Sequence, residues 1–391
     1  DYMKVEANKN IASIGGYAFD EIDKLKNELI EKGVDIIDFG VGDPTTSTPE
    51  FIREAAKKAI DKHKCSGYPP TLGMPAYIEA ICKYTKKRFN VELNSKTQVV
   101  SNLGSKEAIF NFPLAFLNKG DVVLCPNPGY PPYERGTLFA GGTPYYMNLT
   151  EENDFYPDFD KIPGDILKKA RIMWMNYPNN PTSQTATKEF YRKAVDFCHK
   201  HDIILASDEP YGEIYFEEPS MSLLEVSTEG VVVFNSFSKR SAMTGYRVGW
   251  AAGDERVISA FKKLKANVDS GTPYFIQEAA ITALGDETHV EKMRDEYREK
   301  RDIFVDAFEK MGLEVNSPKA TFYIWQKAKG MSGAEFAKKL LEECGMVVSP
   351  GEIFATTVDG VNPGKDYIRM ALVPSIEKTK EAAERMGKLK L

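Results

Sequence analysis

The chain has 391 residues, enough to bury a large core, and its composition is that of an ordinary globular protein. A net charge of -6 provides no basic surface for nucleic acid, and no apolar stretch approaches the ~20 residues that span a membrane. The five cysteines are widely spaced and odd in number, which indicates reduced thiols in a cytoplasmic protein.

The N-terminal part alternates between helical and loop segments. Apolar residues at helical spacing, or clusters of glycine and proline, mark each of them. Helices are predicted at residues 17–32, 49–59 and 75–89, a short strand at 35–39, and loops at 40–44 and 67–73.

From residue 97 onward, short apolar strands alternate with helices. The strands are predicted at 97–101, 121–125, 143–147, 171–176, 203–207, 231–235 and 248–252, with helices at 106–117 and 188–201 among them. This alternation predicts an α/β fold, in which a mostly parallel seven-stranded sheet is covered by helices on both faces. Loops that follow such strands meet at the carboxyl edge of the sheet, where ligands bind.

The pattern changes after residue 277. Helices are predicted at 291–311, 333–344 and 377–389, and strands at 321–325 and 367–372. We interpret this region as a second, smaller α+β domain, and the long charged helix would bridge the two. We expect a large domain at 46–288 and a small domain built from both chain ends, 1–45 and 289–391.

One of the predicted strands runs into two hydroxyls and a lysine, in Asn235-Ser236-Phe237-Ser238-Lys239. Arg247 follows eight residues later between two glycines. Hydroxyls and a guanidinium are good phosphate ligands, and a lysine beside a bound phosphate cofactor suits Schiff-base chemistry. A lysine taken alone is a surface residue, so it is the surrounding pattern that makes Lys239 a candidate.

Three more polar residues lie at the ends of strands or just after them: Asn180, Asp208 and Tyr211. Each alone is explained by a turn, a cap or packing. Together with Lys239 they match the needs of pyridoxal 5'-phosphate (PLP). This cofactor requires an anion beside its pyridine nitrogen, donors to its ring oxygen, and an amine that forms an imine and moves a proton.

The Asn-Pro-Thr, Asp-x-x-Tyr and Ser-x-Ser-Lys…Arg segments stand in the order of the fold-type I, class I and II aminotransferases, and the resemblance covers nearly the whole chain. It implies a PLP-dependent aminotransferase with the fold of aspartate aminotransferase. The implied catalytic residues are Lys239 for the Schiff base, Asp208 for the pyridinium and Tyr211. The ring oxygen would be bound by Asn180 and Tyr211, and the phosphate by Ser236, Ser238 and Arg247.

The strand–turn–helix at 102–107 also resembles this family, in its phosphate-binding turn. The resemblance implies cofactor-binding roles for Gly104, Ser105 and Lys106, since free N–H groups at a helix start favour an anion. The alternative is plain helix capping by Ser105. Tyr130 matches the aromatic residue that stacks on the cofactor ring, and alone it would be a turn tyrosine.

Three residues further apart are implied by the resemblance alone. Tyr68 matches a tyrosine that reaches the phosphate from the neighbouring subunit, which implies a homodimer with shared active sites. Arg369 matches the arginine that binds the substrate α-carboxylate as a bidentate pair. Gly40 matches a glycine whose backbone approaches the substrate. The resemblance also implies that Asn180 binds the substrate.

The sequences of four segments resemble those of the diaminopimelate aminotransferases of lysine biosynthesis: 39–44, 103–108, 139–144 and 267–271. The implied reaction moves an amino group between a diaminopimelate-type substrate and 2-oxoglutarate. Pro210 and residues 240–242 depart from those relatives, and no residue is assigned to the distal end of the substrate.

Other functions remain open. The first alternative is an aminotransferase for aspartate or an aromatic amino acid. A PLP-dependent carbon–sulfur lyase would share every ring-binding residue. A transcription regulator with an aminotransferase-like domain would need a basic DNA-binding domain, and we expect none before Tyr17. His199 and His201 lie on different faces of a helix, so we expect no metal site.

Overall fold

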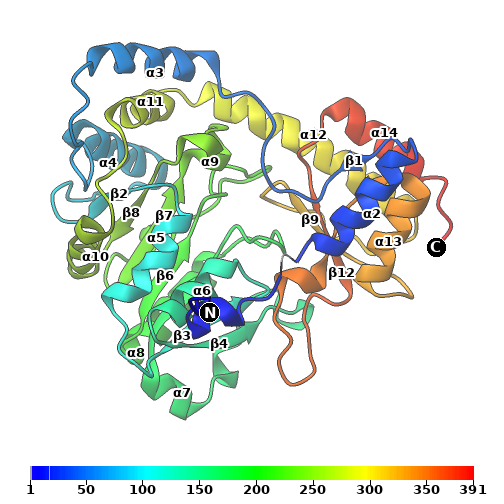
Figure 1. The fold of residues 1–391 in the computed structure, drawn as a ribbon, viewed down its shortest axis with the longest axis horizontal. Coiled ribbons are helices and arrows are strands. Elements are labelled where there is room, and N and C mark those ends of the chain that lie inside the picture. Colours follow the sequence, from blue (N-terminus) through cyan, green and yellow to red (C-terminus); the bar gives the residue numbers. More distant parts are fainter. Residues whose placement is uncertain (1, 17) are drawn as a thin grey trace.

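The computed structural model describes residues 2–16 and 18–391, and its centre is a seven-stranded sheet (Figure 1). The strand order is β2-β8-β7-β6-β5-β3-β4. The strands are β2 (Val99–Asn102), β3 (Val122–Asn127), β4 (Thr143–Asn148), β5 (Ala170–Met175), β6 (Ile204–Asp208), β7 (Val231–Ser236) and β8 (Gly249–Gly253). β8 is antiparallel to both its neighbours and all other pairs are parallel. The predicted α/β fold is confirmed, and each predicted strand is found within two residues of its expected ends.

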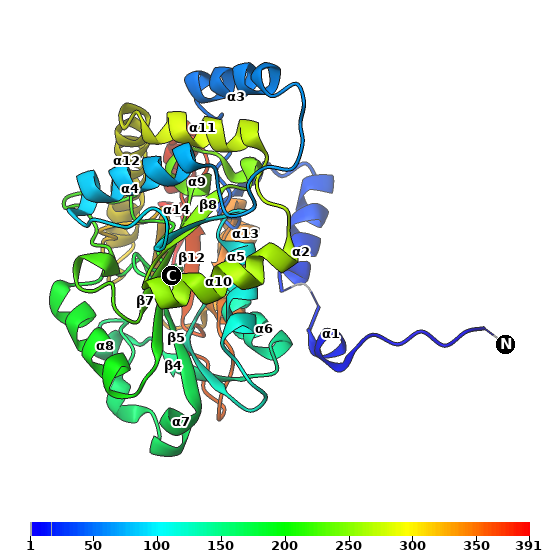
Figure 2. The ribbon, with the colours of Figure 1, turned by 90° about the vertical axis from the view of Figure 1, so that its left-hand side faces the viewer.

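Alternate residues of the sheet enter two separate cores. Met173 and Met175 of β5 pack into one buried cluster, whereas Ile172 and Trp174 pack into the other. One core is covered by α3 (Glu50–Lys62), α4 (Pro75–Phe89), α7 (Gly164–Lys169), α8 (Lys188–Lys200) and α11 (Tyr274–Leu284). The other is covered by α5 (Lys106–Asn111), α6 (Pro131–Phe139) and α10 (Glu255–Val268). Figure 2 shows α8 on one side of the strands and α5 and α6 on the other. Burial on both faces explains the continuous apolar runs of the strands.

One predicted helix is shorter than expected. The helix predicted at 106–117 ends as α5 at Asn111 and continues as a 3₁₀ turn, Phe112–Ala115. Pro113 has no backbone N–H and its ring crowds the preceding turn, so the α-helix cannot continue through it.

A second, three-stranded antiparallel sheet has the order β11-β12-β9. Its strands are β9 (Tyr323–Lys327), β11 (Ser349–Pro350) and β12 (Tyr367–Ala371), and it packs with α12 (Thr288–Lys310), α13 (Gly333–Cys344) and α14 (Ile376–Met386). Figure 1 shows α12 running from the end of α11 towards α14. Within the described ranges, no helix combines the length and apolar character that a bilayer crossing requires.

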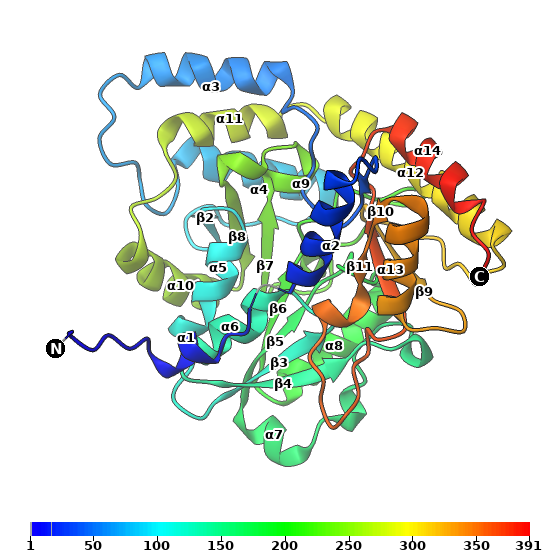
Figure 3. The same cartoon turned by 45° about the vertical axis from the view of Figure 1, so that its right-hand side comes forward.

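The N-terminal segment reaches this second region. β1 (Ile37–Asp38), the core of the strand predicted at 35–39, pairs in parallel with β10 (Met346–Val347). The helix predicted at 17–32 is α2 (Asp20–Glu31), and its expected first residue, Tyr17, lies outside the described residues. Near the start, α1 (Lys9–Ser13) is bonded to α6 through Asn10, while residues 2–8 extend away from the body (Figure 3). We keep the division into 46–288 and 1–45 with 289–391 as a proposal, which the β1–β10 pairing supports.

Candidate active site

The candidate site forms where the sheet strands end. Because β2, β5, β6 and β7 are parallel, their carboxyl ends meet at one edge, with Asn102, Asp208 and Ser236 as terminal residues. β8 runs the other way, so Arg247, two residues before its start, comes to the same edge. Residues far apart in the sequence are thereby brought together.

Asp208 is a buried carboxylate with one oxygen unpaired. Its side chain is 3% exposed, and Oδ2 accepts a hydrogen bond of 2.6 Å from the Tyr133 hydroxyl. Oδ1 has no hydrogen-bond partner among residues 2–16 and 18–391. Burial raises the pKa of Asp208 from 3.8 to about 7, and the Tyr133 bond opposes that shift. A buried oxygen without a partner is costly, so this atom is suited to a ligand that brings a donor.

Lys239 lies in the short helix α9 (Phe237–Arg240), directly after β7. Its Nζ donates to the carbonyl oxygen of Gly42 at 2.7 Å. Burial lowers the pKa of the amine from 10.5 to about 8, with Arg369 and Arg247 acting in the same direction and Asp43 against it. An amine that is partly neutral near neutral pH can act as a nucleophile or a base.

Two tyrosines, Tyr211 and Tyr323, form a bonded pair, and Tyr323 lies against Gly42, whose carbonyl holds this amine. The hydroxyls of Tyr211 and Tyr323 are 3.0 Å apart, and burial raises the pKa of both phenols. The phenols therefore stay protonated and can donate. A side chain on Gly42 would overlap the Tyr323 hydroxyl, so only glycine allows this loop to approach so closely.

Arg369 of β12 is buried among aromatic rings rather than carboxylates. Its guanidinium lies 4.5 Å from the Tyr323 ring centre and 4.1 Å from that of Phe354. It donates to Asn180 Oδ1 at 3.0 Å and to the Gly40 carbonyl at 2.9 Å, while Nε has no partner in the part of the chain that the structure describes. A buried guanidinium with an unused donor is suited to a ligand carboxylate.

The two hydroxyls predicted to bind phosphate are close together, and Arg247 lies at the same edge of the sheet. Ser236 Oγ and Ser238 Oγ are 2.9 Å apart. Arg247, with a positive φ of 52°, donates to the Leu103 carbonyl at 3.5 Å. A side chain on Gly104 would overlap this guanidinium, which explains the glycine.

Ser105 does not act as a plain helix cap. It stands at the N-cap position of α5 but makes no side-chain capping hydrogen bond, so that alternative is wrong. Tyr130, half-buried, is the residue just before α6, and its ring centre lies 5.9 Å from that of Tyr133. Burial raises the pKa of Tyr130, and the Asp208 charge adds to the shift.

Two predicted residues do not join the others. Lys106 is exposed, and within the described ranges it has no hydrogen bond or ion pair to the site. Tyr68 is 86% exposed on the loop between α3 and α4, and nothing in the described part of its own chain bonds its hydroxyl. The site of one chain is therefore formed without Tyr68.

Sequence reasoning missed Tyr133, Tyr323 and Phe354. Tyr133 lies one helical turn after Tyr130 on α6, and this i, i+3 spacing was the available signal. Tyr323 stood inside a predicted strand without any sign of its contact with Tyr211. Phe354 lies in a 3₁₀ turn, Gly351–Phe354, whose approach to Arg369 is a tertiary contact.

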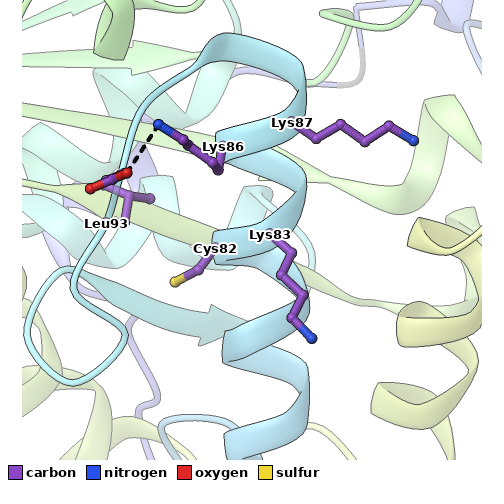
Figure 4. Close-up of a pocket in the computed structure, with 6 residues that line it drawn as sticks. Cys82, Lys83, Lys86, Lys87 and Leu93 are labelled. Carbon is purple, nitrogen blue, oxygen red and sulfur yellow. Dashed lines mark ion pairs between the residues drawn. The ribbon is translucent and has the colours of Figure 1, made fainter.

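A separate groove lies on α4, away from these residues (Figure 4). It is lined by Cys82, Lys83, Lys86, Lys87, Glu92 and Leu93. Lys86 pairs with Glu92 at 3.0 Å, and the lysine side chains fan out from the helix (Figure 4). None of the predicted site residues lines this groove, so it has no part in the arrangement above.

The residues at the sheet edge fit PLP. The unpaired Asp208 oxygen could accept from a protonated ring nitrogen, and Arg247 with the two serine hydroxyls could hold a phosphate. Lys239 would hold the aldehyde carbon, and Arg369 a substrate carboxylate.

Comparison with known proteins agrees with this geometry. The family model "Aminotransferase class I and II" matches residues 34–386. The chain is 47% identical to an LL-diaminopimelate aminotransferase of Aquifex aeolicus, over 96% of this chain and 97% of the relative. It is 42% identical to an LL-diaminopimelate aminotransferase of Nitratidesulfovibrio vulgaris, over 97% and 98%. The solved apo structure of BacF from Bacillus subtilis superposes with a TM-score of 0.90 at 34% identity, covering 100% of this chain and 99% of that one.

Proposed function

The chain belongs to the class I and II aminotransferases, which are PLP-dependent enzymes, and we propose that it moves an amino group between LL-diaminopimelate and 2-oxoglutarate. The observation that carries the choice of substrate is the 47% identity, over nearly the full length of both chains, to an LL-diaminopimelate aminotransferase. The reaction would belong to lysine biosynthesis.

Lys239 is the residue that would move the proton. PLP, when bound, supplies an aromatic ring that stabilises the charge left when the substrate loses its α-proton. The neutral Lys239 amine accepts that proton and returns it, and its pKa of about 8 makes a useful neutral fraction available near neutral pH.

Asp208 and its neighbours would orient the ring. An ionised Asp208 would accept from a protonated ring nitrogen, while Tyr133 fixes its other oxygen, Oδ2. Tyr211 stays protonated, because burial raises its pKa, and it would donate to the ring oxygen. Asn180 Oδ1 accepts from Arg369, which leaves the Asn180 amide nitrogen free to donate to the ring oxygen of the cofactor.

Arg369 would bind the α-carboxylate of either substrate. Asn180 and the Gly40 carbonyl already fix the guanidinium, and the aromatic rings keep water from it. A fixed, partly dehydrated guanidinium binds a carboxylate strongly and in one orientation. This places the α-carbon rather than the distal end, so Arg369 serves both halves of the reaction.

We also infer a homodimer with shared active sites. Tyr68 lies exposed on its own chain, and the family resemblance gives it a role at the neighbouring subunit's phosphate. At 86% exposure, the Tyr68 side chain is free to contact a second chain.

Steady-state kinetics with a panel of amino donors tests the substrate. We expect kcat/KM for LL-diaminopimelate, with 2-oxoglutarate as acceptor, to exceed that for aspartate or tyrosine by about 100-fold or more. Equal or better rates with aspartate or an aromatic donor would contradict the proposal. Thiol release from a sulfur amino acid would indicate a carbon–sulfur lyase instead.

A further inference from the structure

Lys265 is a fully buried lysine near the end of α10, and the roles described above do not use it. It is 2% exposed and forms two ion pairs. Its Nζ lies 3.1 Å from Glu107 Oε1 and 2.8 Å from Asp269 Oδ2. Burying an ammonium is costly even when it is paired, so the segments that its two partners contact are of interest.

Its first partner leads to the turn that contacts Arg247. Glu107 Oε1, the atom that pairs with Lys265, also accepts from the backbone N–H of Leu103 at 3.0 Å. The Leu103 carbonyl in turn accepts from Arg247, and Gly104 follows directly. One carboxylate oxygen therefore joins the buried cation to the backbone of this turn.

Its second partner leads to the end of β2 from another segment. Asp269 accepts from the Gly271 N–H at 2.7 Å, which fixes the bend after α10. The next residue, Thr272, donates its hydroxyl to the Asn102 carbonyl at 3.4 Å. Asn102 is the last residue of β2 and directly precedes Leu103. The contacts that start from Glu107 and those that start from Asp269 thus both reach the backbone of residues 102–104.

We propose that Lys265 is a positioning residue for the phosphate end of the cofactor site. Its charge holds two carboxylates that would otherwise repel each other, and through them it fixes the turn at 102–105 against Arg247. The inference rests on the proposed function, because it takes this turn as the phosphate-binding element. In the described part of the chain Lys265 makes no contact with Lys239 or Asp208, so it acts on the phosphate and not on the amine chemistry.

The test compares PLP with pyridoxal, which lacks the phosphate. Dissociation constants of both are measured by equilibrium dialysis for the wild type, for Lys265→Met and for a matched control, Lys300→Met. Lys300 is also 2% exposed and pairs with Glu296 at 3.2 Å, but it lies on α12. Both substitutions remove a buried ammonium, so a general loss of stability affects both.

We expect the wild type to bind PLP more tightly than pyridoxal. We expect Lys265→Met to reduce this preference by about tenfold or more, and Lys300→Met to leave it within about twofold. An unchanged preference in Lys265→Met, or an equal loss in both variants, would overturn the role of Lys265. A wild type without any preference would instead remove the phosphate site itself, and the proposed function with it.

A milder variant covers the case in which Lys265→Met does not fold. Glu107→Gln keeps an oxygen for the Leu103 N–H but removes the charge that pairs with Lys265. We expect the same loss of preference for PLP, smaller in size. A folded Glu107→Gln protein with wild-type preference would overturn the proposal.

Discussion

Within the described part of the chain Lys239 forms no ion pair; its amine donates to the Gly42 carbonyl and lies 5.6 Å from the Phe322 ring centre. Lys239→Ala removes both the nucleophile and the base, so we expect turnover to fall by about 10³-fold or more. PLP should still bind, because Asp208 and the phosphate ligands remain. Measuring kcat together with bound PLP checks both parts, with the exposed Lys263→Ala as control. Turnover near that of the wild type would end the assignment of Lys239.

Asp208 gives a prediction about pH. Its pKa is 3.8 when exposed and about 7 when folded, so between these values the folded protein binds more protons than the unfolded chain. Stability of the cofactor-free protein therefore falls as pH rises through this window. Glu209 is buried as well, its pKa is raised to about 7, and it acts in the same direction.

The substitution Asp208→Asn removes the contribution of Asp208 to the pH dependence of stability and leaves the contribution of Glu209. Urea unfolding of the cofactor-free protein at about pH 5 and about pH 8 measures it. From about pH 5 to about pH 8, we expect the free energy of unfolding of the wild type to fall by on the order of 1–4 kcal/mol more than that of the variant. Parallel pH dependence of the two proteins would contradict a raised pKa of the buried Asp208.

At the scale of elements, the loop at 40–44 depends on its close approach to β9. Gly42→Ala would force its new methyl group against the Tyr323 hydroxyl and move the carbonyl that holds Lys239. We expect a loss of about 1–3 kcal/mol in the free energy of unfolding and a lower kcat/KM. Gly164→Ala is the control, because its methyl group would meet nothing within 4 Å. Similar effects of the two substitutions would show that the contact with Tyr323 is unimportant.

The elements themselves were largely predictable from the sequence. Strands buried on both faces are continuous apolar runs, so all seven of the large sheet were found. The helix at 106–117 was overextended because the apolar spacing continues through Pro113. The bonds that Tyr133 makes to Asp208 and Tyr323 to Tyr211 were not predictable, since they join residues 75 and 112 positions apart.

At the scale of the whole molecule, the proposed dimer makes one chain complete the site of the other. A Lys239→Ala chain and a Tyr68→Ala chain should each have weak activity alone. Refolded together, they form hybrid dimers in which one of the two sites is intact, and we expect about a quarter of the wild-type activity. Light scattering establishes the dimer first. Hybrids no more active than the parents would contradict shared sites.

The central claim is that LL-diaminopimelate gives its amino group to PLP at Lys239. The most direct measurement mixes the PLP-loaded enzyme with one amino acid at a time, without any acceptor, and follows the absorbance of the bound cofactor. We expect the absorbance to change rapidly with LL-diaminopimelate and with glutamate, and not with aspartate or aromatic amino acids. A change with aspartate or aromatic amino acids but not with LL-diaminopimelate, or no bound chromophore when PLP is supplied, would contradict the claim.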